Sequence, residues 1–114
     1  MKVIIAGGRD FSDYEKLKSF CDETLSDKTD IEIVSGKAKG ADSLGEQYAK
    51  EKNYPVKEFP ADWKLGRGAG YIRNTQMANY SDMLICFWDG KSKGTKNMID
   101  TARNKSLYVY VCRY

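Results

Sequence analysis

The sequence contains no histidine, which removes the commonest general base of enzymes. Ser-His dyads and metal sites built on imidazole are excluded with it. Only three cysteines are present, Cys21, Cys86 and Cys112, and no two of them form a CxxC pair. We therefore expect no zinc or iron–sulfur centre, no other metal and no cofactor.

Long apolar runs are also missing. The first run, within MKVIIAGGRD, stops at Gly7. A signal peptide needs about 7–15 apolar residues at such a place, and a membrane helix needs about 18. We therefore expect a cytoplasmic protein with reduced thiols and no membrane partner.

The sequence also has little excess of positive over negative charge. The 114 residues carry 19 Lys and Arg against 16 Asp and Glu, a net charge of +3, and the basic residues form no block. Charge alone therefore gives little support for nucleic acid as a partner. The length suits one domain spanning residues 1–114.

Five short apolar runs alternate with four helical patterns, which predicts a parallel sheet covered by helices. The runs are Val3–Ala6, Ile31–Val34, Val56–Phe59, Met83–Trp88 and Leu107–Cys112. The helices are expected from a Ser12–Glu15 capping box onward, over Ala41–Lys52, over Ala69–Tyr80 and over Thr95–Asn104.

Composition also predicts the order of the strands. The first and fourth runs are continuously apolar, as in strands buried on both faces. The charged third run and the Tyr-rich fifth run suit the two edges. These features predict an α/β domain with a five-stranded parallel sheet of order 3-2-1-4-5. Its ligand-binding switch point would lie between the first and fourth strands.

The loops that follow these strands are rich in glycine. Two of them, Gly36–Ala41 and Gly90–Thr95, lead into helices and carry two lysines each. Such loops offer free N–H groups and a positive helix end, which suit phosphate. Neither matches the Walker A or the GxGxxG pattern, and an ordinary turn is the alternative for each. Two of them at one sheet edge favour phosphate binding.

Further candidates lie beside these loops. Arg73 could grip a phosphate as a fork and Asn74 could read a base or ribose edge, although both could be surface residues. Trp63 could stack on a base, whereas Trp88 is expected to pack in the core. Asp42, Asp62 and Asp89 either contact a ligand or cap a helix or turn. The expected ligand-binding residues are Gly7, Gly8, Arg9, Asp10, Ser35, Gly36, Gly40, Ala41, Asp42, Asp62, Trp63, Arg73, Asn74, Asp89, Gly90, Lys91, Ser92, Gly94 and Thr95.

The same residues form an ordered series along almost the whole chain: GGRDF at 7–11, SG at 35–36, GAD at 40–42, PADW at 60–63, RN at 73–74 and FWDG at 87–90, then Ser92 and Gly94-Thr95. With this series the chain resembles the YspA/YpsA-related branch of the SLOG superfamily. The resemblance implies a Rossmann-like three-layer domain that binds nucleotides or nucleotide-derived ligands. The superfamily includes LOG-type phosphoribohydrolases, DprA-type single-strand DNA binders and sensors of nucleotide signals in bacterial defence.

One departure from the LOG enzymes bears on activity. They carry a Gly-Thr-x-x-Glu motif whose Glu takes part in catalysis, and here Met98 stands at the Glu position after Gly94-Thr95. Catalysis would then depend on Asp89, Asp42 or Asp62. We therefore expect a sensor or sequestering protein for a nucleotide-derived small molecule, such as a signalling nucleotide, rather than an enzyme.

Two alternatives stay open at this point. One is a LOG-like hydrolase that cleaves an N-glycosidic or phosphate bond of a nucleotide. The less favoured one is single-strand nucleic-acid binding. The Tyr-rich last strand suggests a covered edge, so we also expect a homodimer or a higher homo-oligomer.

Overall fold

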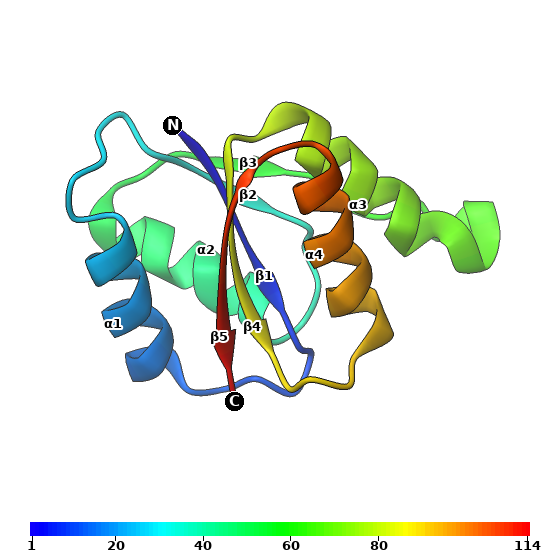
Figure 1. The fold of residues 1–114 in the computed structure, drawn as a ribbon, viewed down its shortest axis with the longest axis horizontal. Helices are drawn as coiled ribbons and strands as arrows, with labels where there is room; N and C mark the ends of the chain where they lie inside the picture. Colours follow the sequence, from blue (N-terminus) through cyan, green and yellow to red (C-terminus); the bar gives the residue numbers. More distant parts are fainter.

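The expected alternation of strands and helices is present in the computed structural model, which describes residues 1–114 (Figure 1). The elements follow in the order β1 (Lys2–Gly7), α1 (Tyr14–Thr24), β2 (Glu32–Ser35), α2 (Ala41–Lys52), β3 (Val56–Glu58), a 3-10 segment η1 (Trp63–Gly68), α3 (Ala69–Tyr80), β4 (Met83–Trp88), α4 (Lys93–Asn104) and β5 (Tyr108–Arg113).

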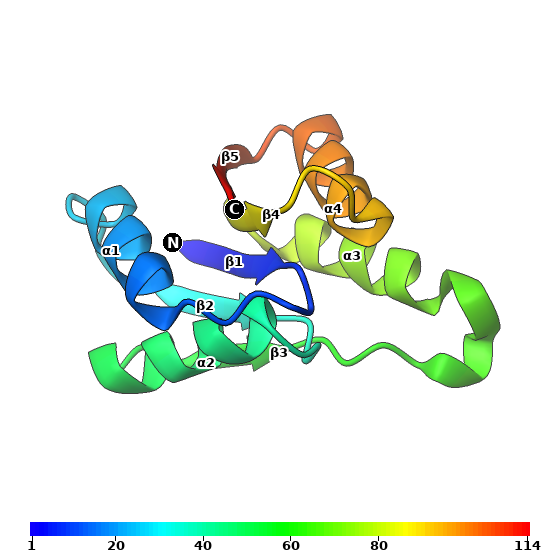
Figure 2. The ribbon, with the colours of Figure 1, turned by 90° about the horizontal axis from the view of Figure 1, so that it is seen from below.

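The five strands form one parallel sheet of order β3-β2-β1-β4-β5, which confirms the predicted order. Helices α1 and α2 cover one face and α3 and α4 the other, giving three layers (Figures 1 and 2). All three residues of β3 are exposed, as the charges in this strand predicted for an edge. The carboxyl ends of β1 and β4 lie side by side at the centre.

Alternate residues of β1 pack into two separate cores. Val3 and Ile5 face α1 and α2, where Leu17 and Tyr48 are buried with them. Ile4 and Ala6 face α3 and α4 and pack with residues of those helices. This period of two follows from the strand geometry. Apolar burial on both faces of β1 and β4 fixes the two central strands, and with them the position of their carboxyl ends.

The starts of two helices differ from expectation. Asp13, not Ser12, caps α1, because its carboxylate accepts a hydrogen bond from the Lys16 amide at 3.1 Å. Helix α4 begins at Lys93, two residues before the predicted start. Its cap is Ser92, whose hydroxyl accepts a hydrogen bond from the Thr95 amide.

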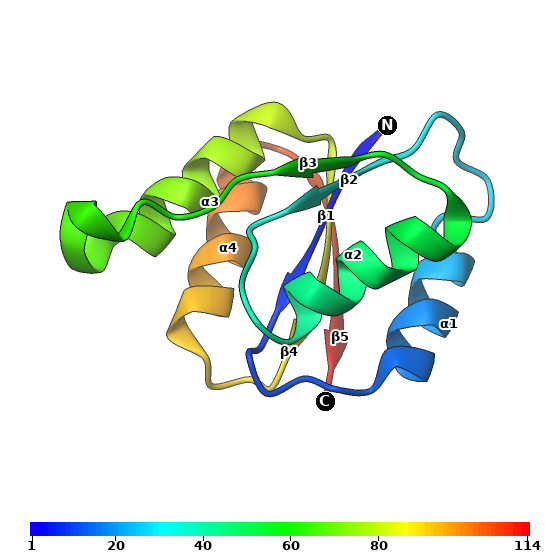
Figure 3. The ribbon, with the colours of Figure 1, turned by 180° about the vertical axis from the view of Figure 1, so that it is seen from behind.

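The segment η1 was not predicted as an element. It continues into α3, and together they extend beyond the rest of the molecule (Figures 1 and 3). None of its six residues is buried, and Trp63 and Leu65 are 60% and 58% exposed. This projecting segment forms one side of the site described next.

Candidate functional site

A cavity of about 530 Å³ lies at the carboxyl ends of β1 and β4, where the sheet order places the switch point. Its size is within the range of small-molecule sites. Its walls come from the loop after β1, the loop and helix start after β2, the η1–α3 segment, the loop after β4 and the start of α4. The lining residues are Ala6, Gly7, Gly8, Arg9, Asp10, Ala38, Asp42, Trp63, Arg67, Gly70, Tyr71, Arg73, Asn74, Met77, Asp89, Ser92, Gly94, Thr95 and Met98.

Most of the residues expected to bind ligand line this cavity, which is called the first cavity from here on. Those that line it are Gly7, Gly8, Arg9, Asp10, Asp42, Trp63, Arg73, Asn74, Asp89, Ser92, Gly94 and Thr95. Those that do not are Ser35, Gly36, Gly40, Ala41, Asp62, Gly90 and Lys91. The loop after β4 therefore contributes Asp89 and Ser92, and α4 contributes Gly94 and Thr95. The loop after β2 contributes Ala38, and the first turn of α2 contributes Asp42.

Arg73 and Asn74 are buried, not exposed at a helix start. Arg73 is 9% exposed, and its guanidinium donates to the Gly36 carbonyl and, through Nε, to Asn74 Oδ1 at 3.1 Å. The Asn74 amide donates to Asn97 Oδ1 at 3.0 Å. These contacts join α3 to the loop after β2 and to α4. They hold the guanidinium in one orientation at the cavity wall.

Asp42 lies in the first turn of α2 and is 4% exposed. Burial raises the pKa of this carboxyl to about 6, although the nearby Arg73 charge opposes the change. The backbone amides of the loop after β2 oppose it as well. Asp42 is therefore a carboxyl at the cavity wall with a pKa of about 6, close to neutral pH.

Asp62 and Asp89 have a different environment, because each caps a turn. Asp62 accepts a hydrogen bond from the Lys64 amide at 3.2 Å and begins η1. Asp89 Oδ1 accepts from the amides of Ser92 and Lys91, both at 2.8 Å, and these bonds hold its pKa below the ordinary value. Both side chains therefore act as caps, and Asp89 also lines the cavity.

The loops after β1 and β2 support each other. The Gly8 carbonyl accepts hydrogen bonds from the amides of Phe11 and Ala41. Gly40 has a φ of +75°, and a Cβ at this position would lie 2.2 Å from the Gly8 oxygen. Gly40 and Ala41 therefore shape the site through the backbone and do not line the cavity.

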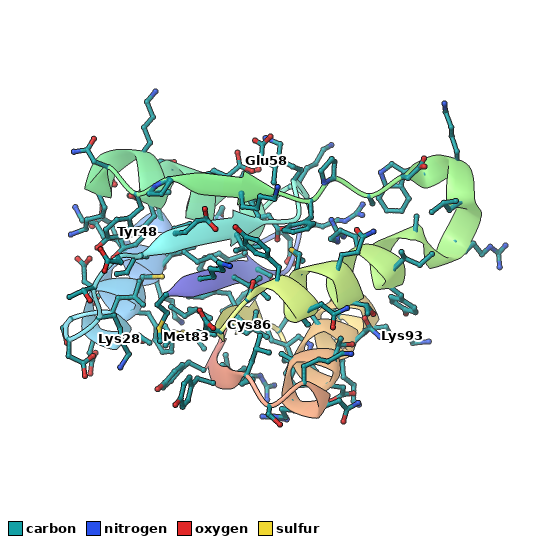
Figure 4. The ribbon with its side chains drawn as sticks, turned by 90° about the horizontal axis from the view of Figure 1, so that it is seen from above. Lys28, Tyr48, Glu58, Met83, Cys86 and Lys93 are labelled. Carbon is teal, nitrogen blue, oxygen red and sulfur yellow. The ribbon has the colours of Figure 1, made fainter.

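The first lysine of the Gly36–Ala41 loop is engaged in ion pairs. Lys37 Nζ lies 2.9 Å from Glu46 and 3.1 Å from Glu58, the residue labelled on β3 in Figure 4. Ser35 donates its hydroxyl to the same Glu46 at 2.6 Å. Ser35 and Lys37 therefore stabilise the loop, and Lys39 is its remaining cation.

Several contributions were not found from the sequence. Tyr114 donates its hydroxyl to Asp10 Oδ1 at 2.6 Å, and its ring packs on Phe11 with centroids 4.8 Å apart. No local pattern links two residues 104 positions apart. Tyr71 and Met77 line the cavity from α3, and their helical spacing carries no mark of a site.

The remaining features concern Trp88, the buried thiol of Cys86, metal ligands and membrane-spanning helices. Trp88 packs beside the α3–α4 core and does not line the cavity, as predicted. Burial raises the pKa of Cys86 to about 12, so this thiol is protonated at neutral pH. No three His, Cys, Asp or Glu side chains are grouped as metal ligands. No helix combines the length and the hydropathy needed to cross a membrane.

Solved structures with the same fold include DNA processing protein A from Streptococcus pneumoniae, with a TM-score of 0.77 and 18% identity. Another is DNA processing protein A from Helicobacter pylori, which binds single-stranded DNA, with a TM-score of 0.71 and 20% identity. The matches cover 96% and 97% of this chain but 49% and 64% of those proteins. The chain thus spans about half to two thirds of their length.

The comparison with curated proteins found no significant match. The model of the YspA, cpYpsA-related SLOG family matches residues 1–66. That stretch contains β1, β2 and β3 with the glycine-rich loops that follow the first two of them. The chain therefore belongs to the YspA, cpYpsA-related SLOG family.

Proposed function

We propose that this domain binds a nucleotide or a nucleotide-derived small molecule in the first cavity and acts as a sensor or sequestering protein. The observation that carries the proposal is Arg73, a buried guanidinium held at the cavity wall by two hydrogen bonds. Burying a charge is costly, and a fixed guanidinium fork matches the geometry of a phosphate. A bound phosphate would add a second counter-charge to that of Asp42.

Other residues of the cavity fit the remaining parts of a nucleotide. Trp63 is 60% exposed and lines the cavity, so its ring is free to stack on a base. Gly94 and Thr95 bring the start of α4 to the same cavity, where the helix dipole favours an anion. Asp10, held by Tyr114, offers carboxylate oxygens to ribose hydroxyls.

Binding without turnover is favoured by Met98. Its side chain is 2% exposed and lines the cavity where LOG-type enzymes carry a glutamate. Hydrolysis is the second candidate, and Asp42 is the carboxyl that favours it, because Asp62 and Asp89 are engaged as caps. Release of free base or phosphate that is lost in Asp42→Asn would support hydrolysis, and no product across a nucleotide panel would remove it.

Single-stranded DNA is the third candidate, because the Helicobacter pylori protein of the same fold binds it. The first cavity carries three arginines and three aspartates, so its charge is balanced, whereas a strand-binding groove is positively charged. We therefore favour a small molecule. An anisotropy titration with a labelled oligonucleotide at low salt that stayed flat would exclude the strand.

The decisive experiment compares two exposed residues of η1. Trp63→Ala should weaken nucleotide binding about 5- to 150-fold, because one aromatic stacking contact is worth about 1–3 kcal/mol. Leu65 is equally exposed and does not line the first cavity, so Leu65→Ala is the matched control and should bind like the wild type. Isothermal titration calorimetry over a panel of mono- and dinucleotides measures both.

Two results would contradict the proposal. One is that no nucleotide of the panel binds to the wild type at high micromolar concentration. The other is that Trp63→Ala and Leu65→Ala reduce the affinity equally, which would mean that binding does not involve the first cavity.

A further inference from the structure

A second cavity of about 460 Å³ lies beside the first. It is formed by the loop after β2, the segment before η1 and side chains shared with the first cavity. The shared residues are Arg9, Ala38, Trp63 and Arg73. The two cavities therefore adjoin, and a ligand in the first cavity could extend into the second.

The two cavities differ in charge. The first has three arginines balanced by three aspartates. The second has four basic residues, namely Arg9, Lys37, Lys39 and Arg73, and no acidic residue. The first cavity thus suits a polar, uncharged part of a ligand that both donates and accepts hydrogen bonds, and the second suits an anion.

Of the four cations in the second cavity, only Lys37 forms a salt bridge. Lys37 is paired with Glu46 and Glu58, and Arg73 lies near Asp42. Arg9 and Lys39 are exposed and form no salt bridge. The pKa of Arg73 is lowered chiefly by burial of its guanidinium, and the nearby charge of Arg9 lowers it further. An anion between them would relieve this repulsion.

We propose that the second cavity is a subsite for a second phosphate group, so that the ligand is a nucleotide with two or more phosphates. The nucleoside lies in the first cavity, one phosphate lies between Arg9 and Arg73, and the next reaches Lys39. This inference rests on the function proposed above and adds a requirement to it. The same pair of phosphates could belong to a free nucleoside diphosphate or to the backbone of a strand, and the test separates these sources.

The test measures affinity for AMP, for ADP and for a 12-nucleotide oligodeoxyadenylate by isothermal titration calorimetry, with the guanine nucleotides in parallel. The wild type should bind ADP about tenfold more tightly than AMP, because the second phosphate gains a charge-assisted hydrogen bond. Lys39→Ala should weaken ADP binding about five- to tenfold and change AMP binding less than about twofold. If the source is a strand, the oligonucleotide binds more tightly than ADP and shows the same loss in Lys39→Ala.

Lys93→Ala is the matched control. Lys93 is an exposed lysine at the start of α4, labelled in Figure 4, and lines neither cavity. This variant removes the same charge and should leave the ADP-to-AMP ratio unchanged. Neither lysine forms an ion pair, so both variants should fold.

The subsite is overturned if the wild type binds ADP and AMP equally, or if Lys93→Ala lowers the ratio as much as Lys39→Ala. In either case AMP binding that depends on Trp63 would leave the proposed function standing. Failure of every nucleotide to bind the wild type would instead remove the proposed function and the subsite together.

Discussion

At the scale of single residues, the polar side chains around the two cavities fall into two groups. Asp62, Asp89 and Lys37 are used by caps or ion pairs within the chain. Arg9 and Lys39 have no ion-pair partner. A position just after a strand end predicts that a residue is near the site. It does not predict whether the side chain is free, because that depends on loop geometry and on distant partners such as Glu58.

Gly40 gives a prediction at this scale. Gly40→Ala should lower the free energy of unfolding by at least about 2 kcal/mol, because it combines a strained positive φ with a clash against the Gly8 oxygen. Gly94 is the matched control, since its φ is ordinary and no heavy atom lies within 4 Å of an added Cβ. Gly94→Ala should cause no loss and a gain of up to about 0.5 kcal/mol.

Urea unfolding followed by circular dichroism measures both glycine variants. Equal stabilities for the two would mean that the loops after β1 and β2 do not touch through Gly40. The close approach of Gly40 to the Gly8 carbonyl would then be absent from the folded protein.

At the scale of elements, α1 tests which residue begins a helix. Asp13→Ala should lower the free energy of unfolding by about 1 kcal/mol, because the Lys16 amide loses its partner. Ser12→Ala should have almost no effect, since the Ser12 hydroxyl makes no hydrogen bond to the helix. Thermal unfolding of the two variants distinguishes them, and a larger loss for Ser12→Ala would restore the capping box expected from the sequence.

The elements of the sheet were predictable because apolar runs are a strong local signal. The continuous runs of β1 and β4 and the charged run of β3 specified the central strands and one edge, and the sheet order followed. The segment η1 was not predictable, because four of the six positions in WKLGRG are charged or glycine and break any apolar period. Its Trp63 was expected as a stacking residue, but its place beside both cavities depends on how η1 projects.

At the scale of the whole molecule, Asp42 connects stability to pH. Its neighbours come from β1, the loop after β2 and α3, namely Gly7, Gly36, Ala38 and Arg73. The remaining acidic groups of the two cavities are Asp10, held by Tyr114, and the capped Asp89. A change in the charge of Asp42 therefore acts on the junction of several elements and should be visible in global unfolding.

The direction follows from the pKa of about 6 in the folded state, against an ordinary value of 3.8. Between these values the folded protein holds the proton more tightly than the unfolded chain does. Stability from this group is thus present at low pH and is lost as pH rises through the window. A difference of about two pKa units corresponds to a loss on the order of 3 kcal/mol, complete near neutral pH.

Asp42→Asn should remove this loss, because the amide does not ionise. From about pH 4 to about pH 7, the stability of the wild type should fall relative to the variant by on the order of 3 kcal/mol, measured by urea unfolding at several pH values. Asp89→Asn is the control. The pKa of Asp89 is lowered, so its contribution changes only below that window and the curve should stay parallel to the wild type. Parallel curves for Asp42→Asn would show that Asp42 ionises as an ordinary carboxyl and would contradict the raised pKa.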